Sequence, residues 1–328
     1  MATSALQNPT RTEGAHHHSG WSSSRLSDGQ FAALLTFPVI IALLAIVGYP
    51  SAYSLWMSFH HIDLIFKKTE YVGLDNYREA LTSPAVGHAL RVTVYYTALV
   101  SIFAVVIAVG GALILNEKFR GRGFLMALVI LPWAVSLYAT AIVWKYLYSA
   151  EWGMFNAVLL KLNIIDSPIN FLSETLAVPA VAIAHAWQIA PLGMYFVLAT
   201  LQVIPEDLYK AAKVDRLSTF DRFRYVVFPY IKAPLLIVMV LVTVEAARAF
   251  DVIFFMTGGG PGDVSTTLTW EVYRVFYKNL QYGQGAALGW LLVLLTTIIT
   301  TAYFLLLFWR RRQRPDAEVV EGLTVSQD

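Results

Sequence analysis

Residues 177–201 read AVPAVAIAHAWQIAPLGMYFVLATL, a run of 25 residues that contains no Asp, Glu, Lys or Arg. A helix needs about 20 mostly apolar residues to cross the hydrocarbon core of a bilayer. Pro191 lies inside the run, and proline is tolerated in such helices where neighbours satisfy the freed carbonyl. The stretch therefore predicts a membrane-spanning helix.

The composition of the whole chain also favours a membrane protein. Of its 328 residues, 57% are hydrophobic and 14% are charged, and the mean hydropathy is +0.57. Soluble domains carry roughly 25% charged residues, so the alternative of a large soluble all-α domain is disfavoured. The chain has no cysteine, which excludes disulfides and thiolate metal sites. Its net charge of +2 says little about partners.

Five further apolar segments complete the predicted fold, an all-α, polytopic transmembrane helical bundle of about six spans. The predicted spans are residues 31–59, 90–115, 124–148, 177–201, 234–255 and 285–309. We expect residues 29–312 to form the transmembrane domain, between disordered cytoplasmic tails at residues 1–28 and 313–328. Three adjacent histidines, His16 to His18, could bind a metal weakly, but we interpret them as a feature of the tail or a cloning remnant.

Lys and Arg residues are unevenly divided between alternate loops, and this division predicts the orientation. With the N-terminus inside, the inner segments hold 15 of the 24 Lys and Arg residues, and the outer segments and helix ends hold 8. The remaining one, Arg248, lies within the fifth predicted span. Both termini are therefore expected in the cytoplasm, as an even number of spans requires.

The inner loop 205–229 reads PEDLYKAAKVDRLSTFDRFRYVVFP. Pro205 suits the first turn of a helix. Leu208, Ala211 and Ala212 follow at the i, i+3, i+4 spacing of one helix face. The first half of the loop therefore predicts a short helix with small residues on one side.

The second half of the loop predicts another short amphipathic helix. Ser218 is a candidate N-cap, and Pro229 is expected to end the helix. Such a pair of helices either lies on the bilayer surface or docks a soluble partner, since small alanines permit close approach.

This loop resembles the conserved EAA loop of ABC importer permeases. Ala211 and Ala212 match its alanines, Asp215 matches its frequent acid, and Val226, Phe228 and Pro229 match its closing motif. Two positions depart from the pattern, because Lys210 stands where Glu is usual and Arg216 where Gly is usual. Glycine adopts positive φ at less cost than arginine, so the turn geometry is expected to differ.

The resemblance implies that the loop fits a cleft on an ATPase subunit and relays ATP-driven closure of the ATPase dimer to the spans. The residues it assigns to this coupling are Lys210, Ala211, Ala212, Asp215, Arg216, Leu217, Phe220 and Pro229. It also implies that ATP and Mg²⁺ bind the partner subunit, so that this chain binds no cofactor.

A glycine-rich segment, TGGGPG at residues 257–262, follows the fifth predicted span. It is expected to end the helix in a tight outer turn, and it lacks the Lys-Ser/Thr of a nucleotide-binding loop. Its residues Gly258, Gly259, Gly260 and Pro261 resemble a motif of carbohydrate-type permeases, the maltose-transporter class. VGLDNY at residues 72–77 and GAA at residues 285–287 fit the same class. These motifs indicate the family and leave the solute open.

Charged residues inside spans usually face the bundle interior or a cavity. Glu245, Arg248 and Asp251 lie at i, i+3, i+6 spacing on the fifth predicted span, with Glu245 near mid-membrane by its distance from Pro234. They are either a structural ion-paired cluster or part of a solute path.

The fourth predicted span offers three further candidates for the solute path. They are Trp187, Gln188 and Tyr195. Trp and Tyr rings pack on sugar C–H faces, and Gln both donates and accepts hydrogen bonds. The alternative is that the two aromatic residues serve packing or anchoring.

Together these patterns predict a non-catalytic permease subunit of an ATP-driven sugar importer in a bacterial or archaeal cytoplasmic membrane. The resemblance implies four kinds of partner: a homologous permease, two ATPase copies, an extracytoplasmic solute-binding protein and membrane lipid, with no nucleic acid. A glycerol-phosphate ester or polyol is the alternative cargo. An ion-gradient-driven secondary transporter would need internal repeats, which we do not find, and a membrane enzyme would need a catalytic constellation.

Overall fold

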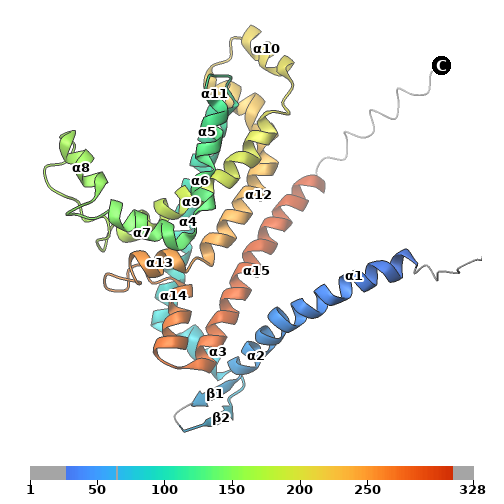
Figure 1. Ribbon diagram of the computed structural model, residues 1–328, viewed down its shortest axis with the longest axis vertical. Coiled ribbons are helices and arrows are strands. Elements are labelled where there is room, and N and C mark those ends of the chain that lie inside the picture. The colour runs from blue at the N-terminus through green and yellow to red at the C-terminus, as the bar shows by residue number, and fades with distance from the viewer. Residues whose placement is uncertain (1–26, 64–65, 313–328) are drawn as a thin grey trace, which may run out of the picture. The chain divides into compact units, whose positions relative to one another are not determined.

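The computed structural model describes residues 27–63 and 66–312 (Figure 1). The predicted tails, with the three adjacent histidines, lie outside the described residues apart from Ser27 and Asp28. Ser27 caps the first helix, α1 (Asp28–Leu43), by accepting a hydrogen bond from the Gln30 N–H.

The chain divides into two compact units at Ala52 and Tyr53. The first contains α1, a π-helical turn (Leu44–Gly48) and the start of α2 (Tyr49–Ser58). Residues 29–58 form one helical stretch long and apolar enough to span a membrane, which matches the first predicted span.

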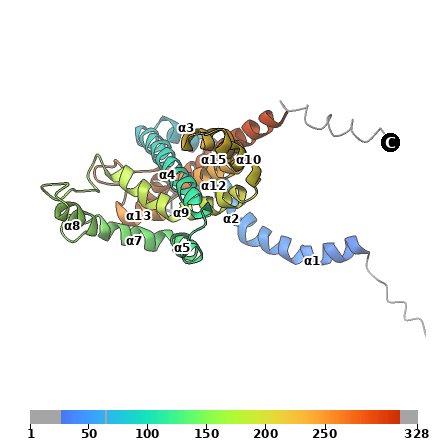
Figure 2. The same cartoon turned by 90° about the horizontal axis from the view of Figure 1, so that it is seen from above.

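The second unit is a helical bundle with one small hairpin. Its long helices are α4 (Pro84–Asn116), α9 (Ala177–Leu201), α12 (Phe228–Ala247) and α15 (Tyr282–Arg312). Seen from above, these four lie together, while α7 (Leu137–Leu147) and α8 (Met154–Lys161) extend to one side (Figure 2). The remaining helices are α3 (Asp75–Thr82), α5 (Arg122–Val129), α6 (Leu131–Ala134), α10 (Glu206–Val214), α11 (Thr219–Arg222), α13 (Asp251–Met256) and α14 (Leu268–Tyr273).

Small residues bring α4 and α9 close together, which is how helices pack where no water drives their association. A β-carbon on Gly193 would lie 3.3 Å from Ala108 Cβ and 2.7 Å from Val238 Cγ1, so α4, α9 and α12 meet at this glycine. On the α4 side, a β-carbon on Gly111 would lie 2.1 Å from Met194 Cε. The seam between α4 and α9 therefore forms the centre of the bundle.

A hairpin of β1 (His60–Asp63) and β2 (Lys68–Tyr71) precedes α3, in antiparallel register with His60 opposite Tyr71. Asn76, from the VGLDNY segment, fixes it by donating from Nδ2 to the carbonyls of Ser58 (2.9 Å) and His60 (3.1 Å). The sequence patterns did not predict these strands.

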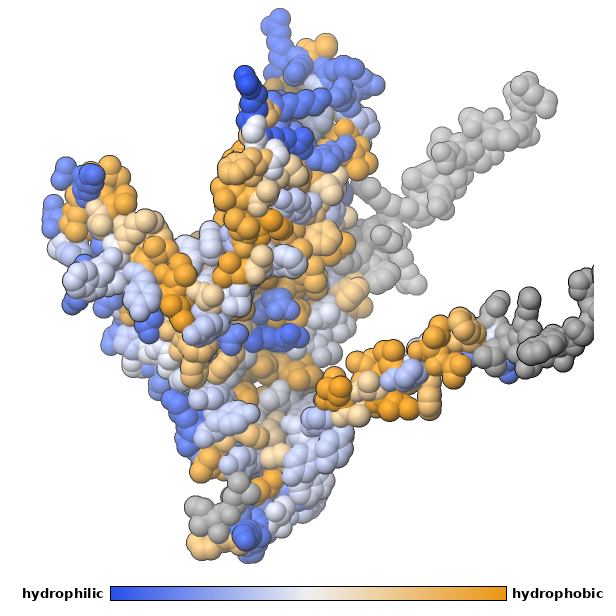
Figure 3. All heavy atoms as spheres, in the orientation of Figure 1, coloured by the Kyte–Doolittle hydropathy of each residue, from blue (hydrophilic) through white to orange (hydrophobic). Residues whose placement is uncertain are grey.

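Among the described residues, five helices are long and apolar enough to cross a membrane, or six if a bent pair counts as one span. The fourth predicted span agrees with α9 at both ends, and the second and sixth lie within the longer helices α4 and α15. Hydrophilic residues gather over α10 and α11, and hydrophobic residues cover the helices below them (Figure 3).

The third predicted span, 124–148, is not a continuous helix, and this is a correction. Residues 122–134 and α7 meet at an angle of 101°. Pro132 lies in the first turn of α6, and the helix ends two residues later, before Val135, which is extended and donates its N–H to the Pro132 carbonyl at 3.2 Å. Ser136 then caps α7 by accepting from the Ala139 N–H at 3.3 Å. The chain therefore turns sharply between α6 and α7.

The fifth predicted span, 234–255, is also corrected at both ends. Pro229 does not end a helix, because α11 continues through a π-helical turn (Phe223–Val227) into α12, giving one helix over residues 219–247. The wider turn lies directly before Pro229, where the missing N–H would break ordinary pairing. At the other end the helix stops at Ala247, and Thr269 Oγ1 donates to the freed Ala249 carbonyl at 2.8 Å.

Candidate functional site

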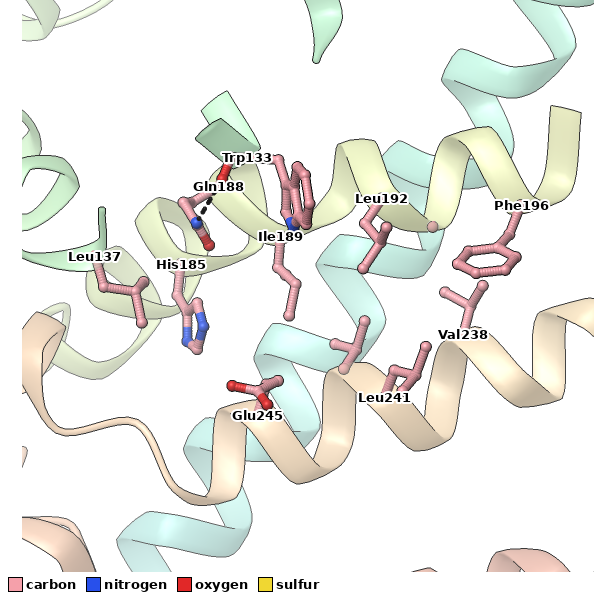
Figure 4. Close-up of a pocket in the computed structure, with 12 residues that line it drawn as sticks. Trp133, Leu137, His185, Gln188, Ile189, Leu192, Phe196, Val238, Leu241 and Glu245 are labelled. Atoms are coloured by element: carbon pink, nitrogen blue, oxygen red, sulfur yellow. Dashed lines mark hydrogen bonds between the residues drawn. The ribbon is translucent and has the colours of Figure 1, made fainter. Parts of the chain in front are cut away.

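A cavity of about 320 Å³ lies between α9 and α12 (Figure 4). Most of its walls are apolar, and the side chains with polar atoms that reach it are His185, Gln188, Glu245 and, through its indole, Trp133. The complete lining is Trp133, Leu137, His185, Gln188, Ile189, Leu192, Gly193, Phe196, Val238, Leu241, Val242 and Glu245. Apolar walls with a few placed polar groups are typical of small-molecule sites.

Helical periodicity places these residues on facing sides of two helices. On α9, residues 185, 188, 189, 192 and 196 recur at intervals of three or four, and on α12 so do residues 238, 241, 242 and 245. Trp133 and Leu137 come from the bend between α6 and α7. The site therefore sits where the broken helix meets two long ones.

Gln188, predicted for the solute path, lines the cavity and also hydrogen-bonds to the bend between α6 and α7. Its Nε2 donates to the carbonyls of Val135 (3.1 Å) and Trp133 (3.4 Å; Figure 4). These carbonyls belong to the bend, where α6 has ended and intrahelical donors are missing. The side-chain nitrogen of Gln188 is therefore already hydrogen-bonded to backbone carbonyls.

Glu245 also lines the cavity, but its predicted neighbours are arranged differently. Arg248 is the C-cap residue of α12 and lies 3.8 Å from Glu245 by its Nη2, and Asp251 begins the separate helix α13. The three do not share one helix face, and Glu245 lies in the last turn of its helix, not at its middle. The side chains of Arg248 and Glu245 are 57% and 55% exposed, so this ion pair by itself contributes little to the stability of the fold.

Trp187 and Tyr195 lie outside the cavity. The Trp187 ring packs edge-on against Trp144, with ring centroids 5.7 Å apart. Tyr195 donates its hydroxyl proton to the Met126 carbonyl at 2.6 Å, which ties α9 to α5. A role for either residue in the solute path stays a prediction.

His185 is a site residue that the sequence patterns missed. It is buried on α9, lines the cavity, and has its Nδ1 2.6 Å from the hydroxyl of Tyr96 on α4. The available signal was a histidine within an apolar span, which is rare unless it has a partner. That partner lies 89 residues away in sequence, so no local pattern reveals it.

The predicted coupling loop forms an elbow of α10 and α11. Arg216 joins the two helices with a φ of 51°, the left-handed conformation usual for glycine. Ser218 caps α11 by accepting from the Asp221 N–H at 3.1 Å, as predicted. Ala212 is buried within the elbow, whereas Val214 and Phe220 are exposed.

Four other residues assigned to the coupling loop also have defined positions. Lys210 pairs with Asp207 at 2.8 Å on the exposed side of α10, and Ala211 is exposed nearby. Asp215 is the C-cap residue of α10, and Leu217 donates its N–H to the Ala212 carbonyl at 3.0 Å. The elbow therefore offers solvent both apolar and charged side chains.

The glycine motif builds a tight turn packed on α14. Gly258 and Gly259 have φ values of 60° and 86°, and a β-carbon on Gly259 would lie 2.3 Å from Trp270 Nε1. Behind them, Ser265 donates its hydroxyl proton to the Gly260 carbonyl at 2.7 Å, and Pro261 follows directly. The motif therefore fixes the conformation of a loop.

In the part of the chain that the structure describes, no group of three or more His, Asp or Glu side chains is placed to hold a metal ion.

Comparison with known proteins matches residues 85–314 to a family model described as a binding-protein-dependent transport system inner membrane component. These residues include the cavity and the elbow. The match therefore covers both features on which the prediction depends.

Two relatives are similar along most of their length. The trehalose/maltose transport system permease protein MalF of Thermococcus litoralis is 33% identical over 268 residues, covering 81% of this chain and 90% of that protein. The trehalose transport system permease protein SugA of Mycobacterium tuberculosis is 29% identical over 270 residues, covering 82% and 86%.

A solved structure shares the fold. It is a chain of a bacterial alginate ABC transporter in complex with an alginate pentasaccharide-bound periplasmic protein. The TM-score is 0.70 at 20% identity, and the match covers 83% of this chain and 92% of that one.

Proposed function

Because the chain belongs to the family of binding-protein-dependent transport system inner membrane components, we propose that it is the permease subunit through which an ATP-driven importer moves a sugar. The cavity between α9 and α12 is the solute path in this proposal. The relatives MalF and SugA, named for trehalose and maltose transport, support the solute class.

One observation carries the coupling mechanism. The helix over residues 219–247 begins at the elbow and ends beside the cavity, where it contributes Glu245 to the wall. At about 1.5 Å per residue it spans roughly 40 Å. A displacement of the elbow is therefore transmitted along one rigid element to the solute path.

The proposal includes partners and an orientation. The elbow faces the cytoplasm and docks an ATPase subunit, present in two copies, which binds the ATP and Mg²⁺ while this chain binds neither. A homologous permease completes the membrane portion, beside Glu245 and Arg248. A solute-binding protein delivers the sugar from the opposite side, as the periplasmic protein in the alginate complex suggests.

The test is ATP hydrolysis by the copurified complex in lipid vesicles, with and without a panel of sugar-loaded binding proteins. Ala211→Asp, on the exposed surface of the elbow, should lose the ATPase from the purified complex and abolish stimulation. We choose Ala211 because Ala212 is buried within the elbow and its substitution would disturb folding.

Ala157→Asp is the matched control, since Ala157 is exposed on α8 and far along the chain from the elbow. It should keep the ATPase bound. Flux that follows an ion gradient, with no ATPase copurifying, would overturn the proposal in favour of a secondary transporter.

A further inference from the structure

Tyr96 and His185 form a buried pair across the central seam of α4 and α9. Their side chains are 0% and 1% exposed, and the Tyr96 hydroxyl oxygen lies 2.6 Å from His185 Nδ1. The rings stack with an interplanar angle of 24°. Within the described residues, this is the hydrogen bond that the structure gives the Tyr96 hydroxyl.

The burial of this pair decides which nitrogen of the imidazole carries the proton. If Nδ1 carried it, the hydroxyl of Tyr96 would accept, and its own proton would be left buried without an acceptor, which is costly. If Tyr96 donates to Nδ1, its proton is satisfied. A neutral His185 then carries its proton on Nε2 and acts as a donor there.

His185 lines the cavity and Nδ1 is used on Tyr96, so we assign the Nε2–H to the cavity. The ring extends from α9 toward α12, and Glu245 stands on α12 beside the same space (Figure 4). An ionised carboxylate only accepts hydrogen bonds. The third polar group, Gln188, already uses its amide nitrogen on the bend. The cavity thus offers the His185 donor from α9 and the Glu245 acceptor from α12. The Trp133 indole N–H is a further donor in the lining, and the Gln188 side-chain oxygen is a further acceptor.

A hydroxyl group fits this arrangement, because it accepts from an N–H and donates to a carboxylate at the same time. A uronate group or a fully ionised phosphate group cannot donate, and the Glu245 charge repels it. No Lys or Arg is among the residues that line the cavity. The cation nearest to Glu245, Arg248 at 3.8 Å, lies outside the lining, so an anionic solute meets the carboxylate before any countercharge.

We propose that Tyr96 holds His185 as a hydrogen-bond donor, and that His185 and Glu245 together select neutral, hydroxyl-bearing solutes over acidic sugars and phosphate esters. His185 and Glu245 contact the solute, and Tyr96 is a positioning residue. The inference rests on the proposed function and deepens it by naming the solute class at that site.

The experiment is saturation-transfer NMR on the purified complex in lipid nanodiscs without binding protein, using maltose, trehalose and a diuronate as probes. The wild type should bind the neutral disaccharides and not the diuronate. Tyr96→Phe should weaken neutral binding by about two- to tenfold, the range expected for one hydrogen bond. Tyr303→Phe is the matched control, because its hydroxyl meets Thr243 Oγ1 (3.2 Å) outside the cavity.

Substitutions at the two contact residues separate chemistry from packing. His185→Leu should abolish neutral binding, and His185→Gln, which restores a donor, should recover part of it. Glu245→Gln should admit the diuronate, a change of selectivity that loss of packing would not produce. If His185→Leu fails to assemble, Tyr96→Phe and Glu245→Gln still decide the question.

Three results would overturn the inference: equal effects of Tyr96→Phe and Tyr303→Phe, equal binding of diuronate and maltose by the wild type, or no transfer to either neutral disaccharide. ATPase stimulation by loaded binding protein is measured on the same preparation. If stimulation persists while any of these results appears, the proposed function stands and only the site assignment fails.

Discussion

Arg216 holds a backbone conformation that costs an arginine more than a glycine. Its φ of 51° places it at the left-handed position that ends α10. There its N–H donates to the Lys213 carbonyl (3.1 Å) while the Leu217 N–H donates to Ala212 (3.0 Å). These two bonds form a Schellman motif, in which glycine is the usual residue.

Arg216→Gly should therefore stabilise the permease by about 0.5–1 kcal/mol, since the β-carbon penalty of the left-handed conformation exceeds the extra chain entropy of glycine. Thermal unfolding of the purified complex measures the change. Arg216→Ala keeps the β-carbon and should bring no gain. Equal unfolding midpoints for the two variants would contradict this account.

Single residues show where sequence reasoning succeeds and fails. The departure at Arg216 is visible in the sequence, but the expectation of an altered turn was wrong, because arginine adopts the glycine conformation there. Ser218 as a cap is a local property and was predicted correctly. The role of His185 depends on Tyr96 in another helix, so it could not be inferred from neighbouring residues.

At the scale of elements, the bend between α6 and α7 depends on one side chain. Gln188→Met keeps the length of the side chain but removes the donor to the carbonyls of Trp133 and Val135. Removing the donor to these two carbonyls, one exposed and one part-buried, should destabilise the complex by about 0.5–1.5 kcal/mol, the net contribution of an ordinary hydrogen bond. Thermal unfolding again measures this loss.

Gln202→Met is the control for this substitution, because Gln202 is exposed at the end of the same helix. It should change stability by less than about 0.5 kcal/mol. Similar losses in both variants would show that Gln188 does not support the bend.

Hydropathy predicted the existence of the spans well, because burial in lipid requires long apolar runs. It could not predict where helices break or continue. Pro132 lies in the first turn of α6 and the chain bends only after Ala134, whereas the helix continues through Pro229 by way of the π-helical turn before it. The second break, at Ala249, depends on Thr269 in α14.

For the whole molecule, the orientation in the membrane is the prediction to test. The chain has no cysteine, so a single introduced thiol is labelled without background. Val214→Cys at the elbow and Tyr71→Cys on the hairpin both occupy exposed positions.

In intact cells expressing the permease without the proposed ATPase, an impermeant maleimide should label Tyr71→Cys, because the excess of Lys and Arg predicts that the elbow lies inside. Val214→Cys should react only in inverted vesicles. The reverse pattern would place the elbow outside and exclude ATPase docking.

The packing of α4 against α9 in the central seam also means that one helix is synthesised well before its partner. The last residue of α9, Leu201, follows the last residue of α4, Asn116, by 85 positions. At roughly 5–20 residues per second, a ribosome needs about 4–17 s to add them. During that interval the nascent α4 has no α9 to cover its alanine face, and lipid or the insertion machinery must shield it until its partner emerges.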